Sequence, residues 1–132
     1  MIFHEVAVGK YLIIDEVNNI YYQIIIFLVI VMNNRMEIAR EFANAINSDK
    51  IISIILFGSV ARGDDTEESD IDILIISNHR EDLDDKISDE IAWIMYDKQE
   101  LISAHVINEE IFNKTKNFSF LTNVLKEGVP IG

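Results

Sequence analysis

The stretch from Phe57 to Ile75 reads FGSVARGDDTEESDIDILI and concentrates much of the polar chemistry of the chain in one place. It opens where an apolar run, Ile51 to Phe57, ends at Gly58 and Ser59. Such a run is typical of a central strand buried on both faces. Glycine lets the backbone approach a ligand closely, and a serine hydroxyl with neighbouring N–H groups can bind phosphate oxygens. By itself, however, Gly-Ser is more often an ordinary strand-ending turn.

Two carboxylates, Asp70 and Asp72, begin a second apolar run that continues to Ser77. Side chains alternate along a strand, so both carboxylates are expected on one face, where they can converge on one or two divalent cations. Two such ions about 4 Å apart can bridge a triphosphate and stabilise the leaving pyrophosphate. The plainer alternative is a solvated strand edge. Carboxylates at the mouth of so apolar a strand need a partner, however, and this favours a metal site.

Around this stretch the pattern predicts an α/β (α+β) domain, with a small mixed sheet of about three core strands flanked by helices. Asn108 is the expected N-cap of a helix whose first turn holds Glu109 and Glu110. The expected elements are a helix over 36–47, strands over 51–57, 70–77 and 101–107, a helical turn at 60–63, a helix over about 81–96, and a last helix near Phe118 that Gly128 and Pro130 end.

The length and charge of the chain limit the classes of function that it can have. A chain of 132 residues fits one domain, and its lack of cysteine excludes disulfides and thiolate metal sites. The net charge of −12 disfavours free nucleic acid as the main partner, because phosphate binding normally requires a basic surface. An acidic surface suits metal ions or a basic protein partner, and the missing cysteines are compatible with a cytoplasmic protein.

The first 35 residues differ in composition from the rest, so the boundary is drawn between an N-terminal extension, 1–35, and a domain, 36–132. The run Ile20–Met32 (IYYQIIIFLVIVM) is shorter than the roughly 20 apolar residues of a membrane span and lacks the features of a signal peptide. No membrane association is expected. One interpretation is a buried or intermolecular strand. The other is that the natural protein starts at Met32 or Met36, and that the extension is translated upstream sequence.

Taken together, Gly58-Ser59, Ala61-Arg62-Gly63 and Ser69-Asp70-Ile71-Asp72 resemble the signature of the DNA polymerase β-like nucleotidyltransferases. More narrowly, they resemble the minimal nucleotidyltransferases of archaea and bacteria, and this resemblance runs from Met36 to about Ile131. It implies the nucleotidyltransferase fold and a substrate that is ATP or another nucleoside triphosphate. It further implies that Gly58, Ser59, Arg62 and Gly63 contact the nucleotide, and that Asp70 and Asp72 bind two Mg²⁺ ions.

The resemblance also implies a protein partner. Members of this family usually work beside a HEPN-type protein encoded next to them. In such pairs the nucleotidyltransferase resembles an antitoxin, which silences a toxic ribonuclease by adding AMP from ATP to a tyrosine. AMP transfer to a HEPN-type protein is therefore the leading hypothesis. The alternatives are a catalytically weak or inactive nucleotide-binding module that neutralises its partner by complex formation, and a small-molecule nucleotidyltransferase, which the short chain disfavours.

One departure from the family pattern concerns the next strand, Leu101–Ile107, where active members generally carry a third acid. Alternation along this strand puts Ser103 at the third-acid position. Glu100 precedes the strand on the opposite parity and qualifies only if the backbone bends, whereas His105 is a candidate base. The departure bears on catalysis rather than on nucleotide binding.

Overall fold

A computed structural model of the chain describes residues 3–8, 11–16 and 20–132, and it divides into two compact units, Met1–Arg35 and Met36–Gly132. The first unit contains an antiparallel hairpin of β1 (Phe3–Val8) and β2 (Tyr11–Glu16). Helix α1 (Ile20–Ile46) begins in the first unit and ends in the second. No helix within the described ranges is long and apolar enough to cross a membrane.

The strand interpretation of Ile20–Met32 is wrong, because this run forms the first part of α1. The predicted start of that helix at Met36 is likewise too late. Short apolar runs do not distinguish a strand from a helix by periodicity, and a run this long exceeds the usual strand length. Neither glycine nor proline occurs between Ile20 and Ile46 to end a helix, and β-branched residues cost a helix only a few tenths of a kcal/mol each.

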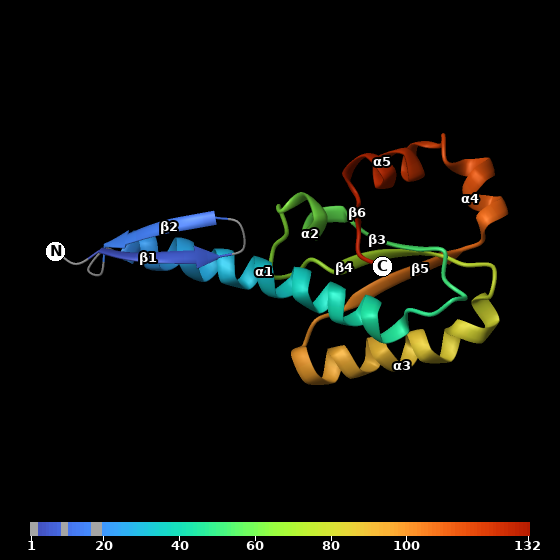
Figure 1. Ribbon diagram of the computed structural model, residues 1–132, viewed down its shortest axis with the longest axis horizontal. Coiled ribbons are helices and arrows are strands. Elements are labelled where there is room, and N and C mark those ends of the chain that lie inside the picture. Colours follow the sequence, from blue (N-terminus) through green and yellow to red (C-terminus); the bar gives the residue numbers. More distant parts are fainter. Residues whose placement is uncertain (1–2, 9–10, 17–19) are drawn as a thin grey trace. The chain divides into compact units, whose positions relative to one another are not determined.

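The second unit is built on a four-stranded mixed sheet, which confirms the predicted fold class (Figure 1). Its strand order is β5-β4-β3-β6. Strand β4 (Ile71–Ile76) pairs antiparallel with β3 (Ser53–Phe57) and parallel with β5 (Ile102–Ile107). These are the three predicted strands. The fourth, β6 (Val129–Pro130), adds to the free edge of β3 and was missed, because two residues are too short to show alternation.

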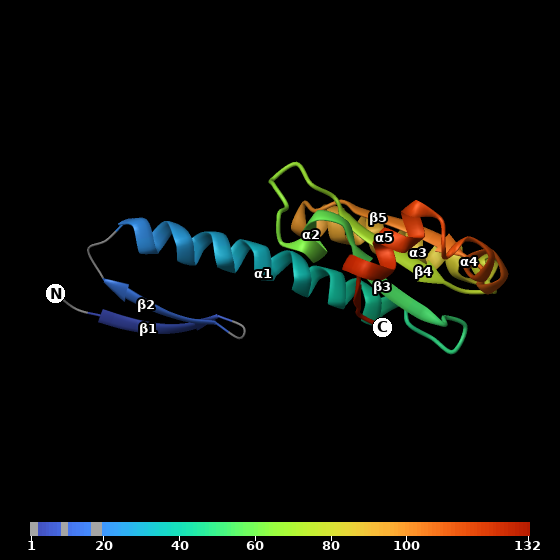
Figure 2. The same cartoon turned by 90° about the horizontal axis from the view of Figure 1, so that it is seen from above.

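Helices cover both faces of this sheet (Figures 1 and 2). One face packs against α3 (Arg80–Lys98) and the part of α1 from Met36 onward. The other packs against α5 (Ser119–Glu127) with Phe112 of α4 (Glu109–Thr115). The sheet is therefore the middle layer of three, and alternation along each strand decides which helices a side chain meets.

Alternation along β4 has one consequence for function. Ile71, Ile73 and Ile75 belong to the core under α1 and α3, whereas Leu74 and Ile76 belong to the core under α5. Asp72 has the parity of the second set, so it begins a row that is otherwise fully apolar. Burial of its neighbours thus fixes the face from which its carboxylate emerges.

Two local predictions were tested by the helix ends. Asn108 is the N-cap of α4, as predicted: its side-chain oxygen accepts a hydrogen bond from the Ile111 N–H at 2.7 Å. The predicted helical turn at 60–63 begins earlier than expected, since α2 spans Gly58–Arg62 and Gly63 caps its end with φ of 81°. The helix starts directly at the end of β3, with no intervening loop.

Candidate functional site

The candidate site forms where β3 ends and β4 begins. Because these strands are antiparallel, Phe57 at the end of β3 pairs with Asp72 near the start of β4. The next residue after Phe57 is Gly58, so the Gly-Ser pair and the two carboxylates, 11 or more residues apart in sequence, are brought to one sheet edge. The structure thereby joins the two halves of the sequence motif.

Gly58 and Asp72 are in direct contact. The backbone of Gly58 has φ of 72°, a left-handed conformation that side chains disfavour. A Cβ at this position would overlap with the Oδ2 atom of Asp72. Glycine is therefore required here for two reasons: the backbone conformation disfavours a side chain, and the carboxylate occupies the space of a Cβ.

The two carboxylates have different surroundings. Asp70 is exposed, whereas Asp72 is half-buried. Burial, and then the negative charge of Asp70, raise the pKa of Asp72 above its ordinary value, while His105 and Arg62 act in the opposite direction. Holding Asp72 ionised therefore costs free energy in the isolated protein, and a bound cation would offset that cost.

Strand β5 brings Ser103 beside Asp72, because the two residues are register partners in the parallel pair. His105 pairs with Leu74 one step further, and its Nε2 atom lies 3.5 Å from the Ser103 hydroxyl. Glu100 lies before the first residue of β5. In the part of the chain that the structure describes, no three His, Cys, Asp or Glu side chains come together as a metal-binding group.

A cleft of about 440 Å³ opens beside this pair of strands, between α2 and α5. Arg62 lines it but is engaged by two acids: its Nε atom lies 3.2 Å from Asp64 Oδ2, and its Nη1 atom lies 3.2 Å from Glu127 Oε2. These hydrogen bonds raise the pKa of Arg62. Gly63 caps α2 and does not line the cleft. The lining residues are Phe57, Gly58, Ser59, Arg62, Asp72, Phe120, Asn123, Val124 and Glu127.

The sequence did not indicate that α5 contributes to the site, yet its residues Phe120, Asn123 and Glu127 line the cleft. They are spaced at i, i+3 and i+7, which is one face of a helix. Leu121 and Val124 form the buried face of the same helix. The spacing was visible in the sequence, but nothing local indicated that this exposed stripe faces the Gly-Ser turn.

The residues at the site fit a hard divalent cation. Carboxylate oxygens are the ligands that Mg²⁺ prefers, and it usually keeps several waters and binds through one or two carboxylates plus substrate phosphates. Asp70 and Asp72 supply such a pair, and among the described residues no salt bridge occupies the half-buried Asp72. At Gly58 and Ser59, the first backbone N–H groups of α2 have no intrahelical carbonyl to bind, which leaves them available for an anion.

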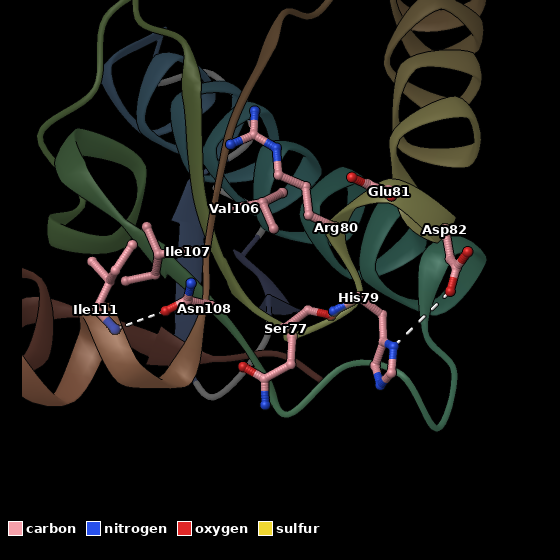
Figure 3. Close-up of a pocket in the computed structure, with 10 residues that line it drawn as sticks. Ser77, His79, Arg80, Glu81, Asp82, Val106, Ile107, Asn108 and Ile111 are labelled. Carbon is pink, nitrogen blue, oxygen red and sulfur yellow. Dashed lines mark hydrogen bonds and ion pairs between the residues drawn. The ribbon is translucent and has the colours of Figure 1, made fainter.

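A second hollow, of about 590 Å³, lies at the opposite end of β4, around Ser77 and the start of α3 (Figure 3). Its polar groups already serve the fold. The buried Ser77 hydroxyl donates to the Lys50 carbonyl and accepts from the His79 N–H, and His79 lies 3.9 Å from Asp82. The hollow is larger than the cleft at Asp72, but the motif chemistry is at the cleft.

Comparison with known proteins agrees with this geometry. The family described as "Nucleotidyltransferase domain" matches residues 36–130. Two proteins of Methanocaldococcus jannaschii are similar in sequence. The one named "Putative protein adenylyltransferase MJ0604" is 48% identical over 99 residues, covering 72% of this chain and 95% of that protein. The one named "Putative protein adenylyltransferase MJ0141" is 37% identical over 99 residues, covering 73% and 97% respectively.

The fold has a counterpart among solved structures. The crystal structure of a protein from Sulfolobus solfataricus, titled a putative nucleotidyltransferase, superimposes with a TM-score of 0.52 at 20% identity. The match covers 78% of this chain and 84% of that one, so it supports the fold alone. The family match extends over most of the chain and includes the whole Gly-Ser and Asp-x-Asp stretch. The chain therefore belongs to the nucleotidyltransferase domain family and is a nucleotidyltransferase by class, as its motif predicted.

Proposed function

We propose that this chain transfers AMP from ATP to a protein partner in a Mg²⁺-dependent reaction, and that the partner is a HEPN-type protein which the chain silences as an antitoxin. The observation that supports this chemistry is the contact of Gly58 with Asp72, because it puts a turn suited to phosphate beside a carboxylate suited to a cation. The names of the M. jannaschii relatives support AMP transfer to protein. The net charge of −12 favours a basic protein surface over nucleic acid as the acceptor.

In this proposal each residue has a defined task. Backbone N–H groups and the hydroxyl at Gly58 and Ser59 bind the triphosphate, and Asp70 and Asp72 hold the cation on the same sheet edge. Mg²⁺, when bound, neutralises phosphate charge and favours ionisation of the attacking hydroxyl. The acceptor oxygen forms a bond to the α-phosphorus, the bond to pyrophosphate breaks, and the acceptor loses its proton.

The test is a direct assay of transfer. The purified chain is incubated with ATP, Mg²⁺ and the product of the neighbouring gene, and that product is weighed by mass spectrometry. The proposal is supported if the neighbour gains the mass of one AMP and if this gain is absent from a reaction run with EDTA. An unmodified neighbour in a mixture where the two proteins form a complex would instead favour the second candidate function.

That second candidate is a nucleotide-binding module that neutralises its partner by complex formation with little or no transfer. It is favoured by Ser103, which stands beside Asp72 at the position where a third carboxylate would lie. Two carboxylates give a divalent cation fewer charged ligands than three, so the ion that activates the acceptor hydroxyl would be held least well. For this second candidate we expect intact nucleotide binding and slow transfer of AMP.

A further inference from the structure

An apolar groove of about 240 Å³ lies on the same sheet face as Asp72 and is not explained by phosphate or metal binding. Its floor comes from β4 and β5 and its wall from α4 and α5. The main lining side chains are Leu74, His105, Ile107, Ile111, Phe118 and Phe120. We propose that this groove binds the base of the nucleotide. The inference rests on the proposed function, in that it assumes a nucleoside triphosphate with its phosphates at Gly58 and Ser59.

The groove adjoins the phosphate cleft. Phe120 lines both hollows. Phe57, which lines the cleft, packs edge-on against Phe120 with ring centroids 5.7 Å apart, and its ring lies 6.1 Å from that of His105 in the groove. The two hollows thus share an aromatic border, across which the proposed nucleotide would extend from the cleft into the groove.

The direction of the groove suits a nucleotide. Leu74 is two residues beyond Asp72 on β4 and on the same face, which places it about 7 Å further along the strand. A triphosphate bound at Gly58 and Asp72 lies at the start of this row. The ribose and base then follow the row toward Leu74 and its register partner His105.

The composition of the groove suits a flat heteroaromatic ring. Phe118 is 64% exposed and Phe120 is 54% exposed, so both rings offer surface to a ligand. Aromatic side chains can stack on any of the nucleobases, because every base has a π-face. Small-molecule sites are lined mainly by apolar groups with a few polar ones that fix orientation. His105 and Thr115 are the polar lining residues, and the Thr115 hydroxyl already donates to the Ile111 carbonyl at 2.6 Å. His105 is thus the side chain placed to read the edge of the base.

The experiment compares ATP with inorganic triphosphate, each titrated in Mg²⁺ into the full chain by calorimetry. Phe118→Ala is the principal variant, because Phe118 lines the groove but not the cleft and makes no side-chain capping bond to α5. Phe120→Ala is the second. Leu125→Ala is the matched control, since Leu125 is a 46% exposed residue of the same helix that lines neither hollow. Thermal melting verifies that each variant is folded.

We expect the unmodified chain to bind ATP more tightly than triphosphate, and Phe118→Ala to weaken ATP binding about tenfold while leaving triphosphate binding unchanged. Phe120→Ala should weaken ATP binding at least as much, and Leu125→Ala should leave the binding of both ligands unchanged. Equal affinity of the unmodified chain for both ligands, or unchanged ATP affinity in both Phe variants, overturns the base site and leaves the phosphate site standing. Failure of the unmodified chain to bind either ligand overturns the proposed function together with the base site.

Discussion

Gly58 lies against the carboxylate of Asp72 so closely that a Cβ would overlap with Oδ2, and its φ of 72° is left-handed. The turn that ends β3 and the carboxylate near the start of β4 therefore fit closely against each other. The obstructing atom is the end of the Asp72 side chain, so relief of the overlap would have to move the proposed metal ligand itself.

We accordingly expect Gly58→Ala to destabilise the protein and to abolish Mg²⁺-dependent ATP binding. Alanine in a left-handed conformation costs about 1–2 kcal/mol, and the added methyl group displaces Asp72 as well. Gly63→Ala is the matched control, since Gly63 has a similar φ of 81° but caps α2 outside the cleft. Denaturant unfolding should show a loss for both variants, whereas calorimetry should show lost ATP binding for Gly58→Ala alone. If the two variants bind ATP with equal affinity, Gly58 is not part of the ATP-binding site.

The raised pKa of Asp72 leads to a pH prediction. The folded protein binds a proton at Asp72 more tightly than the unfolded chain does, so stability decreases as pH rises from the ordinary aspartate value, about 3.9, through the raised folded pKa. Above that window the ionised, half-buried Asp72 destabilises the cation-free protein. Asp72→Asn should therefore raise the melting temperature at pH 7 in EDTA and reduce this decrease with pH.

The comparison that isolates this effect is the same melting series in Mg²⁺. The cation stabilises the unmodified protein by binding its folded state, and Asp72→Asn should lose that gain. Asp84→Asn is a suitable control, because Asp84 is exposed on α3 and does not line the cleft. A lower melting temperature for Asp72→Asn in EDTA would show that the ionised, half-buried carboxylate does not destabilise the folded protein.

The double variant Asp70→Asn with Asp72→Asn tests the cation site itself. Neutral amides lose most of the attraction for a hard cation, so Mg²⁺-dependent ATP binding should become undetectable or fall at least tenfold. Calorimetry with ATP in Mg²⁺ measures it. The exposed pair Asp84→Asn with Asp85→Asn on α3 changes the net charge equally and should leave ATP affinity as it is. Unchanged affinity in the double Asp70 and Asp72 variant would remove both residues from the site.

The elements near the motif were predictable because burial and alternation agree there. Ile54 and Leu56 face one core and Ile55 and Phe57 the other, so the run from Ile51 to Phe57 indicates a strand buried on both faces. The site partners on α5 were not predictable, because Phe120 meets Phe57 only through the packing of a helix far along the chain. Periodicity reports which face of an element is buried, but not which neighbour covers it.

Truncation before Met36 tests the domain boundary. The buried core residues that α1 contributes to the second unit all follow Met36, which packs against the same core: they are Ile38, Ala39, Phe42, Ala43 and Ile46. A chain that starts at Met36 should therefore fold cooperatively and bind ATP with the affinity of the full chain. Circular dichroism melting and calorimetry check both points. Loss of cooperative melting, or a weaker affinity for ATP, would show that residues 1–35 contribute to the domain.

The last prediction concerns Ser103, which the parallel register of β4 and β5 places beside Asp72. Ser103→Asp adds a third carboxylate to this face, so it should tighten metal binding and raise any rate of AMP transfer. Without metal, the new charge repels Asp70 and Asp72 and should lower the melting temperature. Added Mg²⁺ or Mn²⁺ should recover that loss by binding the folded state, so the metal-dependent rise in melting temperature should exceed that of the unmodified chain. Ser103→Asn, which has the same shape without the charge, should show neither the loss nor the enhanced recovery. If Ser103→Asp gains no metal-dependent stability, Ser103 does not face the cation, and His105 or Glu100 becomes the candidate for the third position.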